Sequence, residues 1–126
     1  SLGCIYLNDN SHKSVFFKEE LYKLTNEQLM SVKVYADIKR NFTLMDSCFM
    51  VCCITNNKDE VVSFQEYSFK TFQNEKDWVH VSKIFDVRKY SVWDNKLLVY
   101  FHNKETNQKV FIDNVGIELY SFPIEN

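Results

Sequence analysis

The amino-acid sequence predicts an all-β domain, an antiparallel sandwich of two sheets with seven or eight strands. Short runs of residues alternate between apolar and polar with the period of two that half-buried strands require. The chain has 11 Phe, 7 Tyr and 2 Trp, aromatic types that are enriched in strands. It has only two glycines and one proline, and Asn takes their place where turns are expected.

The first strands are expected in residues 13–24 and 29–40, joined by a turn at "TNE". The second of these alternates most clearly. Its apolar face carries Val32, Val34, Ala36 and Ile38, and its polar face carries Lys33, Tyr35, Asp37 and Lys39. Residues 18–30 also fit an amphipathic helix, because three leucines stand among Glu, Lys and Gln. Both interpretations stay open, and the neighbouring alternation favours the strands.

The later strands follow at similar spacing. Residues 48–55, "CFMVCCIT", are apolar on both faces, which predicts a central strand covered on both sides. Residues 77–87 alternate well, residues 61–72 only loosely, and residues 96–103 are largely apolar. The connections "NNKDE", "QNEKD", "YSVWDN" and "NKETNQ" combine amides with charge, as hairpin loops do.

Length and charge place the chain, residues 1–126, in the class of single soluble globular domains. Charged residues make up 25% and hydrophobic ones 45%. Lys and Arg number 15 against 17 Asp and Glu, a net charge of −2 that does not suggest a nucleic-acid surface. No apolar run is long enough for a transmembrane helix.

The four cysteines are expected to be free thiols. Cys48, Cys52 and Cys53 crowd into one strand, where a local disulfide is sterically poor, and they suit burial as small apolar residues. Cys4 ends "SLGC", which resembles the end of a bacterial lipoprotein signal, although no charged or apolar region precedes it. Lipidation of Cys4 is therefore the less favoured alternative.

Catalytic motifs are missing from the sequence. His12, His80 and His102 lie in separate segments without metalloprotease spacing, and no serine stands in a nucleophile elbow. A glycine-rich phosphate loop is excluded, since the only glycines are Gly3 and Gly116. The sequence therefore predicts a protein that is not an enzyme.

Three segments resemble the galactose-binding-like, jelly-roll β-sandwich family, which includes many carbohydrate-binding modules. They are "EKDWVHVSKIFDV" with Trp78, then "KLLVYFHN", then "VFIDNVGIEL", and they cover roughly the last 45 residues. The earlier runs "KSVFFKEEL" and "SVKVYADIK" resemble its earlier strands more faintly. The family's N-terminal strand is short or absent here, which suggests a fragment of a longer protein.

The resemblance implies a noncatalytic carbohydrate-binding accessory module of a bacterial envelope or secreted protein, with a glycan as its ligand. Sugar rings stack on exposed aromatic rings, so Trp93 in "YSVWDN", with Tyr90 beside it, is the first candidate for ligand binding. Tyr35 and Tyr67 are candidates on the polar sides of their strands, whereas Trp78 is assigned to the core or its rim. The alternative is a structural or protein-interaction domain without a sugar site, whose partner is another protein or a neighbouring domain.

Asp113 raises a separate question. It shares strand parity with Phe111, Val115 and Ile117, so a regular strand would turn its carboxylate into the core. A buried carboxylate needs backbone N–H donors, a Lys or Arg partner, or a cation. In the family an aspartate near this place can hold a structural calcium, although Asn114 here replaces a second acidic residue. We expect hydrogen bonding first and calcium second, and no required cofactor.

Overall fold

The computed structural model describes residues 5–7, 13–25, 27–40, 48–69, 77–104 and 110–121. Along them follow β1 (Ile5–Leu7), β2 (Lys13–Glu20), α1 (Leu21–Leu24), β3 (Ser31–Arg40), β4 (Cys48–Thr55), β5 (Val61–Ser68), β6 (Val79–Asp86), the 3-10 turn η2 (Arg88–Tyr90), β7 (Lys96–Asn103) and β8 (Val110–Tyr120). No helix among the described residues has the length and apolar character needed to cross a membrane.

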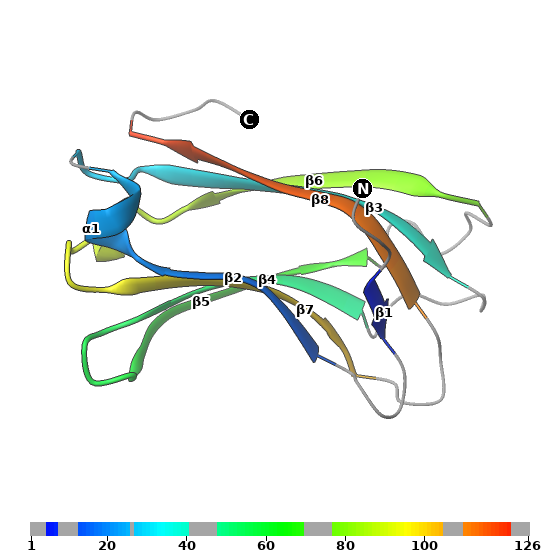
Figure 1. The fold of residues 1–126 in the computed structure, drawn as a ribbon, viewed down its shortest axis with the longest axis horizontal. Coiled ribbons are helices and arrows are strands. Elements are labelled where there is room, and N and C mark those ends of the chain that lie inside the picture. The colour runs from blue at the N-terminus through cyan, green and yellow to red at the C-terminus, as the bar shows by residue number, and fades with distance from the viewer. Residues whose placement is uncertain are drawn as a thin grey trace.

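The strands form two four-stranded sheets that pack face to face (Figure 1). Sheet A has the spatial order β1-β8-β3-β6, and sheet B has the order β2-β7-β4-β5. Neighbouring strands run antiparallel throughout both sheets. The prediction of an all-β antiparallel sandwich is confirmed.

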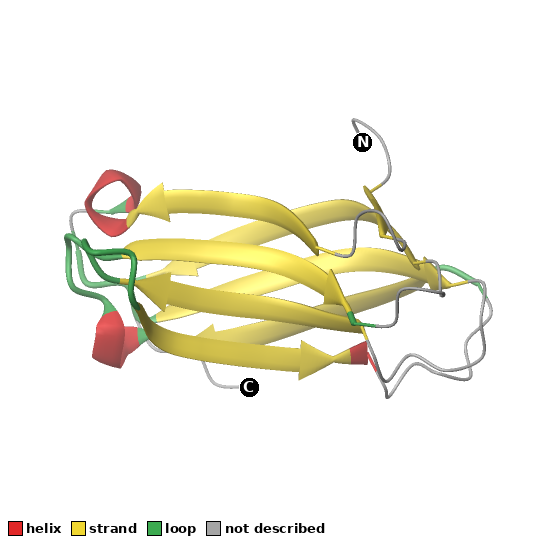
Figure 2. Cartoon of the chain, turned by 90° about the horizontal axis from the view of Figure 1, so that it is seen from below, coloured by secondary structure: helices red, strands yellow, loops and turns green. Residues whose placement is uncertain are grey.

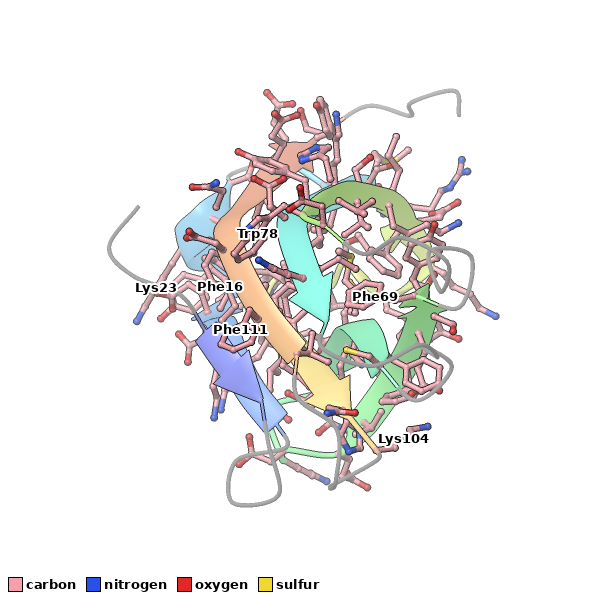
Figure 3. All side chains as sticks on the ribbon, turned by 90° about the vertical axis from the view of Figure 1, so that its right-hand side faces the viewer. Phe16, Lys23, Phe69, Trp78, Lys104 and Phe111 are labelled. Carbon is pink, nitrogen blue, oxygen red and sulfur yellow. The ribbon has the colours of Figure 1, made fainter. Side chains whose placement is uncertain are left out.

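The core lies between the sheets and is built from alternating apolar positions, as predicted. The four apolar side chains of β3 are at most 1% exposed, because successive residues of a strand point to opposite faces. Sheet B adds Met50, Cys52, Ile54, Leu97, Val99 and Phe101 to the same cluster. Figure 3 shows Phe69 inside the sandwich and Lys23 and Lys104 at its periphery.

The strand β4 is central in its sheet, as predicted, because it pairs with both β5 and β7. Its second apolar face is not covered by a further layer of described residues, since these form two layers (Figure 1). Val51 and Cys53 are only 0% and 4% exposed yet lie outside the core cluster. Their cross-strand partners on β7 are Tyr100 and Leu98.

The ambiguous stretch 18–30 is neither a long strand nor a long helix. The strand β2 ends at Glu20, earlier than predicted, and the single turn α1 follows it. Leu21 and Leu29, at the two ends of this connection, are 3% and 2% exposed and join the core. The helical periodicity of the leucines therefore reflects the single turn at Leu21–Leu24 and a separately buried Leu29 just before β3.

The predicted register of β8 is wrong in its first half because the strand contains a β-bulge. Asp37 pairs with Asp113 but Tyr35 pairs with Gly116, so one residue of β3 faces two residues of β8. Asn114 stands at this bulge with a left-handed φ of 51°, a conformation that Asn tolerates. The bulge changes the parity of the strand, so Val110 and Ile112 are buried and Asp113 is only half-buried. The core does not receive this carboxylate.

The described cysteines fit the expectation of free thiols. Cys48, Cys52 and Cys53 are free and buried, and burial raises the pKa of the Cys52 thiol to about 12. A thiol with such a pKa stays protonated and unreactive at neutral pH. Cys4, with its proposed lipidation, lies outside the described residues.

Candidate functional site

The loop that carries Trp93 is held in shape by its own hydrogen bonds. It follows η2, and the Asn95 backbone N–H closes a turn by donating to the Val92 carbonyl at 2.9 Å. The Asn95 side chain, in a residue only 8% exposed, donates from Nδ2 to the Tyr90 carbonyl at 2.9 Å. The backbone beneath Trp93 is therefore fixed by a buried amide.

The same loop is fastened to the connection between β2 and β3. The Leu21 N–H donates to the Asn95 carbonyl at 2.9 Å, and the Tyr22 N–H donates to the Trp93 carbonyl at 3.1 Å. Below them the Ser91 hydroxyl lies against the carbonyls of Leu29 and Val87, and its one proton serves one of them at a time. Figure 2 shows that α1 and η2 lie at the same end of the sandwich. Two segments far apart in sequence thus form one fixed unit.

Between these two segments lies a hollow of about 550 Å³, which we call the loop-end hollow. Its lining residues are Leu21, Tyr22, Thr25, Glu27, Gln28, Leu29, Ser91, Val92 and Trp93. Trp93 is 68% exposed and Tyr22 is 47% exposed. Their ring centroids lie 5.6 Å apart at an interplanar angle of 71°. The size is within the range of about 300–1,000 Å³ that is common for small-molecule sites.

The orientation of Tyr22 is supported by charged neighbours. A hydrogen bond between the Tyr22 hydroxyl and the Glu20 carboxylate lowers the pKa of Glu20 and raises the pKa of Tyr22. The Lys23 ammonium lies 3.6 Å from a Glu20 oxygen and 5.8 Å from the centre of the Tyr22 ring. These contacts are exposed and each is weak, but together they favour one position of the ring beside Trp93.

The polar side chains of the hollow can bond a hydroxylated ligand. The Gln28 amide donates from Nε2 to the Arg88 carbonyl at 3.0 Å, which anchors the group and leaves its carbonyl oxygen as an acceptor. The Thr25 hydroxyl accepts from the Glu27 backbone N–H at 3.0 Å. The Glu27 carboxylate has no ion pair among the described residues. Aromatic rings beside such groups are suited to bind a sugar.

The other predicted ligand residues lie elsewhere. Tyr90 precedes the loop, but its ring packs against the core rather than lining the hollow. Tyr67 on β5 also packs against the core, with the Lys83 ammonium 5.6 Å from its ring centre. It does not project from the polar side of its strand. Trp78 is 43% exposed and outside the core cluster, so it belongs to the rim. Only Trp93 of the predicted residues lines the hollow.

Tyr35 lies on the outer face of sheet A. A Cβ added at Gly116 would lie 2.0 Å from the Tyr35 Cζ, so the ring crosses β8 at the one position where no side chain blocks it. The centre of the His80 ring lies 6.1 Å away. Tyr35 is therefore packed across its own sheet, and it is not one of the residues that line the hollow.

Next to Tyr35 is a set of bonded polar side chains, the outer-face network of Asp37, His80, Asp113 and Asn114. Asp37 accepts from the His80 Nδ1 and from the Asn114 Nδ2, both at 2.8 Å. These two hydrogen bonds lower the pKa of Asp37, the one from Asn114 contributing most. Asp113 accepts from the Asn114 backbone N–H at 2.8 Å. The donors offset the repulsion between two aspartates that face each other across the strands.

The outer-face network does not provide a calcium site by itself. Asp37 is bonded to N–H donors, whereas calcium needs six to eight oxygen ligands. Within the described part of the chain, no group of three or more His, Cys, Asp or Glu is arranged to hold a metal ion. Calcium at Asp113 thus stays a prediction, to be tested with a chelator.

Sequence reasoning missed Tyr22, Glu27 and Gln28. All three lie in the stretch that was interpreted as strand and turn, and no local pattern connects it to residues 91–95. His80 and His102 also lie apart, since His80 is on β6 of sheet A and His102 is on β7 of sheet B. Which distant segments come into contact depends on the order of the strands in the two sheets, and no local sequence pattern predicts that order.

Comparison with known proteins finds no matching family model and no match among curated proteins. Solved structures do match. The chain resembles a structure titled "CBM4 structure and function" with a TM-score of 0.56 and 12% identity, over 95% of this chain and 73% of that one. It resembles "Family 16 Carbohydrate Binding Module-2" with a TM-score of 0.51 and 12% identity, over 84% of this chain and 70% of that one.

An arabinose-bound α-L-arabinofuranosidase also matches, with a TM-score of 0.48 and 9% identity over 85% of this chain. The chain spans only 17% of that enzyme's length. At these identities, the two modules with TM-scores above 0.5 establish the fold alone. This fold is the β-sandwich of carbohydrate-binding modules, as the sequence resemblance implied.

Proposed function

We propose that this chain is a noncatalytic carbohydrate-binding module and that the loop-end hollow holds the sugar. The observation that carries the proposal is Trp93, 68% exposed on a loop fixed by the buried Asn95 amide and by Tyr22. This indole lies outside the core cluster, so its packing contribution among the described residues is limited to the edge contact with Tyr22. The structural likeness to carbohydrate-binding modules supports the same function.

The physical basis is the fit between a sugar and the side chains that line the loop-end hollow. A pyranose ring has a face of C–H groups that packs on the negative face of an aromatic ring. Its hydroxyls then need partners at the edges, which Gln28 and Glu27 supply. Because the β2–β3 connection and the loop of residues 91–95 are already hydrogen-bonded to each other, little conformational entropy is lost when a ligand binds. The accessory role in an envelope or secreted protein is part of this proposal and rests on the sequence resemblance.

A second function, protein interaction, has its own supporting observation. On the outer face of sheet B, Phe64 and Val61 are 51% and 60% exposed beside the buried Val51 and Cys53. Apolar side chains grouped on a sheet face are suited to bind a protein partner. This function needs neither Trp93 nor the hollow, so the two proposals separate experimentally.

A glycan-array screen followed by isothermal titration tests the sugar-binding function. We expect at least one glycan to bind, and Trp93→Ala to weaken its binding at least tenfold. Trp78→Ala is the matched control, because it removes the chain's other indole from outside the hollow, and we expect it to leave affinity unchanged. An array without ligands, or equal effects of the two substitutions, would contradict the proposal.

A further inference from the structure

The charge of the loop-end hollow restricts the sugars that it can accept. Of the nine described residues that line it, Glu27 alone is charged. Its carboxylate has no ion pair among the described residues, and it is therefore open to a ligand. A carboxylate accepts two hydroxyl hydrogen bonds from a neutral sugar and repels a carboxylate or sulfate placed at the same position.

Two cations near the hollow, Lys23 and Arg88, are already paired. Lys23 lies between the carboxylates of Glu19 and Glu20, at 3.9 Å and 3.6 Å. Arg88 forms a two-pronged contact with Asp86, with N–O distances of 3.0 Å and 2.7 Å. An anionic sugar would have to break one of these pairs to gain the Lys23 ammonium or the Arg88 guanidinium.

A groove beside the hollow combines three lysines with two glutamates. It is lined by Lys18, Lys23, Lys96, Glu19 and Glu20. The Lys96 ammonium lies 3.1 Å from an Asp59 oxygen, and the contacts of Lys23 are those given above. Two of the three lysines of the groove are thus paired with carboxylates, and Lys18 lines the groove and not the hollow.

We infer that the loop-end hollow selects uncharged sugars over acidic ones and that Glu27 determines this selection. The inference rests on the proposed sugar-binding function and specifies its ligand class. Glu27 acts in two ways, as an acceptor for the hydroxyls of a neutral sugar and as a fixed negative charge against uronic acids. Because the hollow is open to solvent, the repulsion is screened by salt, and selection is strongest at low ionic strength.

The test uses matched probes. Linkage-matched tetrasaccharides of glucose, galactose and mannose are each titrated beside their C6-oxidised uronate forms, at about 20 mM and about 200 mM salt. In any series that binds, we expect the neutral sugar to bind at least tenfold more tightly at low salt. The ratio should fall at high salt, and Trp93→Ala should weaken binding of the neutral sugar at least tenfold.

Glu27→Gln tests the assigned residue, because it keeps the shape and removes the charge at an exposed position that folding does not need. We expect the preference for the neutral sugar to shrink at least threefold. Glu66→Gln is the control, since it changes the net charge equally on another face of the molecule, and we expect it to leave the preference unchanged.

Three failures are distinguishable. A uronate that binds through Trp93 as tightly as its neutral partner would overturn the selection and leave the sugar-binding function in place. An unchanged preference in Glu27→Gln would overturn the role of that residue. Absence of binding by all six probes, together with an empty glycan array, would overturn both proposals.

Discussion

The loop-end hollow and the outer-face network use similar polar residues in opposite ways. In the network, Asp37 accepts from His80 and Asn114, and Asp113 accepts from the Asn114 backbone N–H, so the polar groups bond to each other. In the hollow, hydrogen bonds hold the backbone, and the side chains of Trp93 and Glu27 are left to face a ligand. Internal bonding is typical of a structural role, and polar groups left open on a rigid frame are typical of a binding site.

The largest effect is expected at the hydrogen bond that holds the hollow together. Asn95→Ala removes the donor to the Tyr90 carbonyl from a site that is 8% exposed. We expect a loss of about 1–3 kcal/mol in unfolding free energy, together with weaker glycan binding. Urea denaturation and titration calorimetry measure the two quantities. If stability falls and affinity does not, the hollow does not depend on a rigid loop.

A smaller effect, restricted to stability, is expected at the bulge. Asn114→Ala places a residue with a Cβ and no amide at a φ of 51° and removes the bond to Asp37. We expect a loss of about 1–2 kcal/mol and no change in glycan affinity. Asn114→Gly separates the two causes, because it accepts the backbone angle and loses only the side-chain bond. Equal losses in both variants would show that the backbone angle contributes nothing.

Asp113→Asn should change stability still less. The substitution keeps an oxygen that can accept from the Asn114 N–H, and the side chain is on the outer face of sheet A. We expect the free energy of unfolding to stay within about 0.5 kcal/mol. A chelator should likewise leave the melting temperature of the native protein unchanged. A melting temperature that falls in chelator and returns with calcium would show a cation at Asp113 after all.

The smallest effect is expected from acid on the Asp37 hydrogen bonds. The pKa of Asp37 in the folded protein is lowered from its ordinary 3.8 by bonds from Asn114 and His80. The stabilisation that these hydrogen bonds give the folded protein is therefore complete at pH values above the pKa of Asp37 in the unfolded chain. It is lost as the pH falls through the lower pKa of Asp37 in the folded protein. The difference in urea midpoint between the native protein and Asp37→Asn should shrink below about pH 4. A constant difference from neutral pH to about pH 3 would contradict this.

The sequence carried enough information to predict the fold and one residue of the candidate site. Alternation on β3 and β6 is a local property of each strand, so it was recognisable directly. The bulge was not, because one left-handed residue at Asn114 reverses the parity that places Asp113. The partners of Trp93 were also hidden, because the contact of Tyr22 with the 91–95 loop depends on how distant segments meet.

The central claim is that Trp93 contacts the sugar, and its fluorescence tests this most directly. The chain has two tryptophans, so Trp78→Phe leaves Trp93 as the only indole. Titration of this variant with a glycan identified on the array should give a saturable change in emission, with the same dissociation constant as calorimetry. The reciprocal variant, Trp93→Phe, should show no change. Binding measured by calorimetry while the emission of Trp93 stays constant would contradict the account.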